Sequence, residues 1–170
     1  EEFLSKLRDA QGVWFTGGRH WRVADAYLNT RTHEALFALL DRGGVIGGSS
    51  AGATLQGTFM IRGDTSGHEI IVGDHIKGFG FLRNVSIDQH HLARNRQYDM
   101  LEVVEAHPEL LGIGIDEGTA IVVQGDEFEV LGRSYVAIYD NQRIFGRAGR
   151  FYFLRSGDRY NMATREILTR

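Results

Sequence analysis

The sequence of 170 residues contains no cysteine and only one proline, Pro108. Without cysteine the chain has no disulfide framework, no thiol nucleophile and no cysteine ligand for a metal. No apolar run approaches the ~20 residues that a membrane-spanning helix needs, and no secretory signal is visible at the start. We therefore expect a cytoplasmic protein without a membrane association, or a secreted one if a preceding segment carries a signal.

Charge of one sign does not dominate either, because the net charge is only -3. This balance gives no reason to expect binding to nucleic acid or to a membrane surface. The seven histidines form no H-E-x-x-H or other ligand spacing, so we expect no metal and no cofactor. With 42% hydrophobic residues and no linker or repeat, residues 1–170 are expected to form one domain.

Hydrophobic periodicity predicts helices and strands in alternation over the first two thirds of the chain. The predicted helices are 1–10, 32–42 with Thr32 as N-cap, 51–58 and 94–107, and the predicted strands are 13–16, 45–48, 69–72, 85–88 and 112–115. Strands then follow one another at 119–123, 127–131, 135–139 and 151–154. The pattern indicates an α/β fold whose mainly parallel sheet lies between helices and continues into a C-terminal antiparallel extension.

The strand predicted at 45–48 runs into Gly48-Ser49-Ser50-Ala51-Gly52, which fits G-x-S-x-G. In this motif a serine sits on a sharp turn between a strand and a helix, and small neighbours leave its hydroxyl exposed. The helix N-terminus behind Ser50 would favour a developing oxyanion. The alternative is a glycine-rich turn that only packs tightly.

A serine hydroxyl needs a base and a group that orients the base. His90 and Glu117 each follow a predicted strand, as Ser50 does, and in an open α/β sheet such positions share one edge. Asp116 competes with Glu117, but neighbouring strand residues point to opposite faces, so only one enters the crevice. The order Ser…His…acid disfavours an ordinary α/β-hydrolase. Surface histidines and a turn carboxylate are the alternative interpretation.

Three blocks of the sequence, in the same order, resemble the cyanophycinase family of serine exopeptidases, which is related to the aspartyl dipeptidases. The blocks are Gly47–Ala53, Ile87–His90 followed by Arg94-Asn95-Arg96, and His107–Glu117. The resemblance implies Ser50 as nucleophile, His90 as base and Glu117 as third member of the triad. It also implies a flavodoxin-like fold shared with class I glutamine amidotransferases and an oxyanion hole built from the backbone N–H groups of Gly18 and Ala51.

The same resemblance implies a site for a peptide substrate that contains aspartate. The residues expected to line it are Asp88, Gln89, Arg94, Arg96 and His20. Two of the family's substrate residues differ here, since His20 stands in place of a glutamine and Asp99 in place of a third arginine. The resemblance therefore implies a serine exopeptidase that hydrolyses aspartyl or β-aspartyl bonds, with cyanophycin as one candidate substrate.

Three further expectations come from this resemblance. The N-terminal strands of the family have no counterpart, so we expect the chain to be N-terminally incomplete. A homodimer is expected from the family. The alternative function is a catalytically silent binding domain of the same fold that captures acidic peptides, and an amidotransferase-like acyl transferase is a third possibility.

Overall fold

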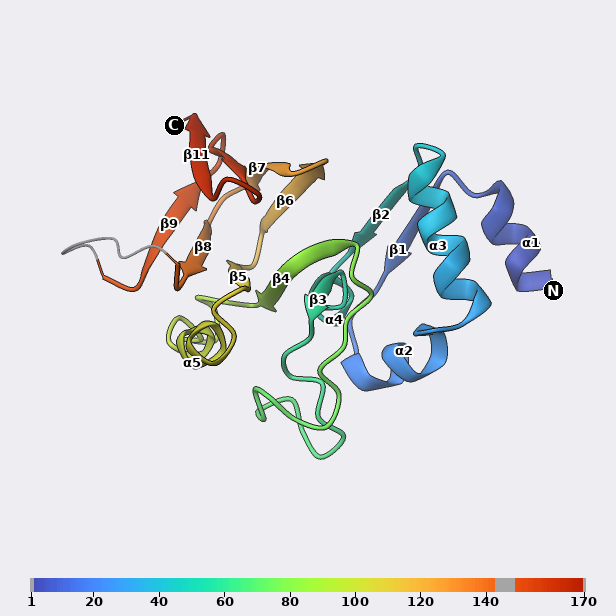
Figure 1. Cartoon of the computed structure of the whole chain (residues 1–170), viewed down its shortest axis with the longest axis horizontal. Helices are drawn as coiled ribbons and strands as arrows, with labels where there is room; N and C mark the ends of the chain where they lie inside the picture. The colour runs from blue at the N-terminus through green and yellow to red at the C-terminus, as the bar shows by residue number, and fades with distance from the viewer. Residues whose placement is uncertain (1, 143–148, 170) are drawn as a thin grey trace. The chain divides into compact units, whose positions relative to one another are not determined.

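A computed structural model of the chain describes residues 2–142 and 149–169. Its contacts divide the chain into two compact units, Glu1–Ile87 and Asp88–Arg170, coloured from blue to green and from green to red in Figure 1. Each unit combines strands with few helices, so the fold is mixed α/β. Within the described residues, no helix is long and apolar enough to cross a membrane.

The first unit carries most of the helices. Its elements are α1 (Glu2–Asp9), β1 (Gly12–Phe15), α2 (His20–Tyr27), α3 (Arg31–Asp41), β2 (Val45–Gly48), α4 (Ala51–Thr54), β3 (Gly57–Phe59) and β4 (Leu82–Gln89), whose last two residues belong to the second unit. β1 pairs with β2 in parallel, and β3 pairs with β4 in parallel. Figure 1 shows α1 and α3 on one side of the β1–β2 pair.

Two apolar clusters hold the first unit together. Leu7 of α1 packs with Leu36 and Leu39 of α3, and Val13 and Ile46 of the β1–β2 pair lie against them. The second cluster joins α2 to the segments that follow α4; its buried members are Ala24, Leu55, Met60 and Phe79. Phe15, the last residue of β1, touches both clusters. The end of β1 is therefore fixed by packing, which matters because the turn that follows it approaches Ser50.

The second unit is dominated by antiparallel strands. Its elements are α5 (Asp99–Ala106), β5 (Leu111–Ile115), β6 (Thr119–Gln124), β7 (Glu127–Gly132), β8 (Tyr135–Asp140), β9 (Phe151–Arg155), β10 (Arg159–Asn161) and β11 (Glu166–Thr169). β8 pairs antiparallel with both β5 and β9. A four-stranded antiparallel sheet has the order β11-β10-β7-β6.

The expected mainly parallel sheet is matched only in part. Among the described residues of the first unit, β1–β2 and β3–β4 pair in parallel, whereas β5–β8, β8–β9 and β6–β7 in the second unit pair antiparallel. The predicted antiparallel strands at the C-terminal end are confirmed. Short connections such as the Gly125-Asp126 turn between β6 and β7 allow only antiparallel neighbours, because a parallel pair needs a long crossover.

Several predicted elements are wrong in extent or kind. The helix predicted at 51–58 ends at Thr54, because Gly57 already pairs with β4. The helix predicted at 94–107 begins only at Asp99, and Thr30 rather than Thr32 caps α3 by accepting a hydrogen bond from the backbone N–H of His33. No strand forms at 69–72, where the chain makes turns and bends. Helix α2 and strands β10 and β11 were not predicted.

Candidate active site

Ser50 lies in a strained backbone conformation between β2 and α4, with φ 54° and ψ -120°. L-residues rarely adopt this conformation, and it persists only where the surroundings enforce it. A Cβ atom on Gly48 would overlap the carbonyl oxygen of Gly52, and one on Gly52 would overlap that of Phe15. The two glycines therefore permit the close backbone approach that forces Ser50 to the tip of a sharp strand-to-helix turn.

The Gly17-Gly18 turn lies against the side chain of Ser50. β1 and β2 pair in parallel with Phe15 opposite Gly48, so both strands end at the same edge. A Cβ atom on Gly17 would lie 3.1 Å from Cβ of Ser50 and 3.5 Å from its Oγ atom. Gly18 has a φ of +142°, which favours glycine. The register of this strand pair thus brings a glycine turn beside the serine hydroxyl.

In the second unit, His90 and Glu117 are hydrogen-bonded. His90 follows β4 and has a φ of 53°, and Glu117 lies two residues after the end of β5. The Nδ1 atom of His90 is 2.9 Å from Oε1 of Glu117. The His90 side chain is 23% exposed and that of Glu117 53%. An imidazole whose Nδ1 donates to a carboxylate carries its lone pair on Nε2, which is the tautomer that a serine hydrolase requires.

Asp116, the competitor of Glu117 in the sequence, makes different contacts. Its Oδ1 atom accepts hydrogen bonds from the backbone N–H groups of Leu92 at 3.0 Å and Ala93 at 2.9 Å. Its Oδ2 atom accepts a bond of 2.5 Å from the hydroxyl of Ser134. Burial alone would raise the pKa of Asp116, but these hydrogen bonds outweigh it and lower the pKa. Asp116 therefore anchors the turn after His90 as a carboxylate.

His91, beside His90, belongs to the core of the second unit. Its side chain is 1% exposed, with Nδ1 3.3 Å from Oδ2 of Asp88. Its Nε2 atom lies 2.6 Å from the hydroxyl of Tyr139, which in turn donates to the carbonyl oxygen of Gln97. Since that hydroxyl proton goes to Gln97, His91 is the donor to Tyr139. The two adjacent histidines thus have different surroundings, and only His90 bonds Glu117.

The expected substrate residues divide into buried and exposed ones. Arg96 is buried and donates from one nitrogen to the backbone carbonyl of Gln89 at 2.8 Å and to its side-chain oxygen at 3.1 Å. The same nitrogen lies 3.6 Å from Oδ1 of the fully buried Asp88. Arg94 is exposed, while His20, the first residue of α2, is buried. Arg96 therefore supports the end of β4 from within, and Arg94 presents its side chain to solvent.

Two residues of this region had no role in the sequence-based hypothesis. Ser134 bonds Asp116 across 18 positions, and Tyr139 bonds His91 across 48 positions. No local motif marks either residue, because their partners lie far away along the chain. Among the residues that the structure describes, no group of three or more His, Asp or Glu side chains could hold a metal ion.

Comparison with known proteins assigns this arrangement to a family. The sequence profile of peptidase family S51 matches residues 1–131. The chain belongs to peptidase family S51. The predicted resemblance to the cyanophycinases is thereby confirmed, as is the enzyme class, a serine-type peptidase.

Curated relatives extend the S51 match over almost the whole chain. A cyanophycinase of Geminocystis herdmanii is 35% identical over 98% of this chain and 68% of its own length. A cyanophycinase of Trichormus variabilis is 33% identical over 96% of this chain, and one of Synechococcus elongatus is 30% identical over 98%. The chain spans 61% of the Trichormus protein and 58% of the Synechococcus protein.

Solved structures agree with the S51 fold. A peptidase from an acI-B1 Actinobacterium superposes with a TM-score of 0.68 at 25% identity, over 94% of this chain and 63% of the other. A Listeria monocytogenes protein assigned to peptidase E gives a TM-score of 0.59 at 18% identity, over 78% of this chain and 65% of the other. The second likeness concerns the fold alone.

Proposed function

We propose that this S51 chain is a serine exopeptidase of cyanophycinase type that hydrolyses aspartyl or β-aspartyl peptide bonds through an acyl-enzyme on Ser50. The observation that carries the proposal is the backbone of Ser50, with φ 54° and ψ -120°. A serine is strained at these angles, and strain of this kind is retained where it exposes a nucleophile. A turn that served packing alone would be better built with glycine.

The proposed reaction follows from the chemistry of the three residues. The hydroxyl of Ser50 attacks the substrate carbonyl while Nε2 of His90 takes the hydroxyl proton. Glu117 holds the imidazole through Nδ1 and stabilises its charged form. His90 then protonates the leaving amine, and water attacks the acyl-enzyme with His90 again acting as base. In this proposal the two units work together as one peptidase domain over residues 1–170.

The oxyanion of the tetrahedral intermediate is assigned to the backbone N–H groups of Ala51 and Gly18. Support comes from the first unit, where the Gly17-Gly18 turn packs against the side chain of Ser50. Backbone donors aimed at a developing oxyanion typically contribute about 3 kcal/mol each to the transition state. They need no cofactor, and the proposal includes none.

Substrate selection is assigned to the residues expected from the family. Arg94 is exposed, and its guanidinium suits a carboxylate of an aspartate-containing peptide. The other four expected residues are buried: His20, Asp88, Gln89 and Arg96. In the proposal these residues support the wall of the substrate site. The flavodoxin-like form of the complete sheet, a homodimer and a cytoplasmic location are further parts of the proposal that rest on the sequence resemblance.

A panel of substrates tests the proposal. The full chain and its Ser50→Ala variant are incubated with cyanophycin, with β-aspartyl dipeptides and with α-aspartyl dipeptides, and released products are identified by mass spectrometry. Serine-dependent release from the polymer supports a cyanophycinase, and cleavage of dipeptides alone supports a related exopeptidase. Product formation that is equal in both proteins, or absent from both, contradicts the proposal. Specific binding of acidic peptides without turnover would instead support the silent binding domain.

A further inference from the structure

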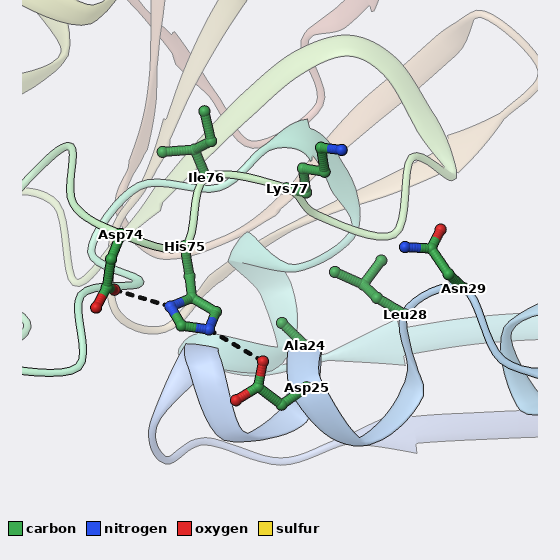
Figure 2. Close-up of a pocket in the computed structure, with 8 residues that line it drawn as sticks. All are labelled: Ala24, Asp25, Leu28, Asn29, Asp74, His75, Ile76 and Lys77. Atoms are coloured by element: carbon green, nitrogen blue, oxygen red, sulfur yellow. Dashed lines mark hydrogen bonds and ion pairs between the residues drawn. The ribbon is translucent and has the colours of Figure 1, made fainter.

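The imidazole of His75 in the first unit lies between two carboxylates. Its Nδ1 atom is 2.8 Å from Oδ1 of Asp74, and its Nε2 atom is 3.0 Å from Oδ1 of Asp25 (Figure 2). Ionised carboxylates only accept hydrogen bonds, so both ring nitrogens must donate. Only the doubly protonated, positively charged imidazole has two N–H groups. The geometry therefore fits a cationic His75.

Asp74 and His75 belong to residues 60–78 of the connection between β3 and β4, a segment that we call the 60–78 loop. Asp74 accepts hydrogen bonds from the backbone N–H of Thr65 at 3.0 Å and from its hydroxyl at 2.5 Å. Asp64 accepts from the backbone N–H groups of Ser66 at 2.7 Å and Asp74 at 3.1 Å. Hydrogen bonds inside the loop thus fix Asp74, and the neighbouring His75 contacts Asp25 outside the loop.

Asp25, the second partner of His75, belongs to α2. This helix begins directly after the Gly17-Gly18 turn, and its N-cap residue Arg19 makes no side-chain capping bond. A second contact joins the same two segments, because a guanidinium nitrogen of Arg19 lies 3.4 Å from Nδ1 of His68. The 60–78 loop is therefore tied to α2 near both ends of the helix, and α2 continues directly from the turn beside Ser50.

Other charged groups surround this contact. His75 and Asp25 line a cavity of about 340 Å³ together with Lys77, as Figure 2 shows, and Asp64 lies behind Asp74. On α2, the ring of Trp21 lies 6.2 Å from that of His75, and Arg22 stacks over Trp21. The neighbourhood thus has three carboxylates, Asp25, Asp64 and Asp74, and two cations, Lys77 and Arg22.

The balance of these groups favours the charged imidazole. The hydrogen bond with Asp74 raises the pKa of His75 above its usual 6.5, partial burial opposes it, and the bond with Asp25 raises it further. The same His75 bond lowers the pKa of Asp74 to about 2. The stabilisation from His75 is complete below pH 6.5 and is lost as the pH rises through the raised pKa. The stabilisation from Asp74 is complete above its usual pKa of 3.8 and is lost only as the pH falls toward 2.

We propose that cationic His75 is a positioning residue that ties the 60–78 loop to α2 and so holds the Gly17-Gly18 turn against Ser50. The inference rests on the proposed function, in which the N–H of Gly18 is an oxyanion donor. A neutral imidazole has one N–H, which stays with the adjacent Asp74. Its Nε2 lone pair then faces the carboxylate of Asp25, the contact is lost, and the part of α2 around Asp25 is held less firmly to the loop. The tie is closed near neutral pH and opens on the alkaline side.

The first test measures the titration of His75 directly in the full chain. Imidazole resonances are followed by NMR against pH, and the His75→Gln variant identifies the resonance. We expect His75 to titrate above 6.5, and Asp25→Asn to lower that value because the amide carries no charge. Asp41→Asn, on α3, is the matched control and should leave it unchanged. Titration at or below 6.5, or no response to Asp25→Asn, overturns the proposal.

The second test links the tie to turnover. In the wild-type chain kcat on a cleaved peptide should fall as the pH rises through the His75 titration. Asp25→Ala and His75→Ala, which remove one partner of the contact, should lower kcat at pH 6 about tenfold, as expected for a displaced donor, and should abolish this alkaline decline. KM should change less than about twofold, since the tie touches no substrate, and Asp41→Ala should behave as wild type. An unchanged kcat in Asp25→Ala overturns the positioning role while leaving the proposed peptidase intact.

A third measurement separates the tie from the peptidase. Amide hydrogen exchange of α2, corrected for the intrinsic effect of pH, should accelerate in the wild-type chain above the His75 titration and be fast throughout in Asp25→Ala. If no peptide is cleaved but this pattern is found, the proposed function fails and the tie stands. Exchange that is equal in the two proteins overturns the tie whatever the activity.

Discussion

The Nδ1 atom of His90 lies 2.9 Å from Oε1 of Glu117, a contact that joins the residue after β4 to a residue just after β5. Glu117 is only half-buried, so the carboxylate stays hydrated while it accepts this hydrogen bond. The bond places the Nδ1 proton toward Glu117 and leaves Nε2 as the acceptor. The positive φ of His90 and the anchoring of the following residues by Asp116 hold the ring at this position.

Replacement of the neighbouring carboxylates Glu117 and Asp116 by amides should affect different properties, kcat in one variant and thermal stability in the other. Glu117→Gln removes the charge that stabilises the imidazolium, and we expect kcat to fall roughly 100-fold with little change in thermal stability. Asp116→Asn removes the carboxylate that holds the turn after His90, and we expect a lower melting temperature. Steady-state kinetics and thermal unfolding of both variants measure the two effects. A larger loss of kcat in Asp116→Asn than in Glu117→Gln would reverse the assignment.

The pH dependence of stability provides a separate check on Asp116. Its pKa is lowered in the folded chain, so its stabilising effect is present above the usual value of 3.8 and is lost as the pH falls below it. The stability difference between the wild-type chain and Asp116→Asn should therefore shrink on acidification from pH 6 to pH 3. Urea unfolding at several pH values measures this difference. A difference that is constant over the range would contradict the role given to this carboxylate.

The adjacent histidines should separate activity from stability. His90→Ala should abolish measurable turnover and leave the fold intact, since the ring is partly exposed. His91→Ala removes a buried ring bonded to Asp88 and Tyr139, and we expect a loss of about 3 kcal/mol in the free energy of unfolding. Peptide hydrolysis and urea unfolding distinguish the two variants. Loss of turnover in a stable His91→Ala protein, with activity retained in His90→Ala, would show that the base is misassigned.

The strain at Ser50 predicts a gain in stability on substitution. Glycine adopts a φ of 54° and a ψ of -120° without the steric conflict of a side chain. Ser50→Gly should therefore be inactive and more stable than the wild-type chain by about 1 kcal/mol. Ser50→Ala, which keeps the strain, is the matched control and should show no such gain. Equal stability of Ser50→Gly and Ser50→Ala would mean that the surroundings do not strain this residue.

The two arginines near His90 should affect different quantities. If the exposed guanidinium of Arg94 binds the substrate's carboxylate as proposed, Arg94→Ala should raise KM for acidic peptides about tenfold and leave kcat within threefold, because this contact is the same before and during the reaction. KM for the same peptide with its carboxylate amidated should be unaffected. Arg96→Ala leaves buried Asp88 without the nearby guanidinium and should instead lower the melting temperature. An unchanged KM in Arg94→Ala would remove Arg94 from the substrate site.

The sequence predicted the features that depend on local patterns. The strand-to-helix turn at Ser50 follows from small residues on both sides, and the strained angles agree with the motif. The β-strands from Thr119 to Arg155 were predicted because turn residues separate short runs in which apolar and polar residues alternate. The choice between Asp116 and Glu117 was left open, because strand alternation states that one of them turns inward but not which one.

What the sequence could not predict depends on partners far along the chain. The helix was predicted from residue 94, yet the chain before it is anchored by Asp116 through the amides of Leu92 and Ala93, and α5 starts only at Asp99. Arg96 was expected to line the substrate site, and it is buried with hydrogen bonds to Gln89. His75 gave no signal, because Asp25 lies 50 positions away. In each case a tertiary hydrogen bond overrides the local preference.

The most direct measurement is covalent labelling of the nucleophile. The full chain is treated with a fluorophosphonate at neutral pH, and the modified peptide is identified by mass spectrometry. We predict stoichiometric modification of Ser50, much slower labelling in His90→Ala, and none in Ser50→Ala, with Ser49→Ala labelled as wild type. Labelling at another serine, or a folded wild-type chain that remains unlabelled, would contradict Ser50 as the nucleophile of a serine peptidase.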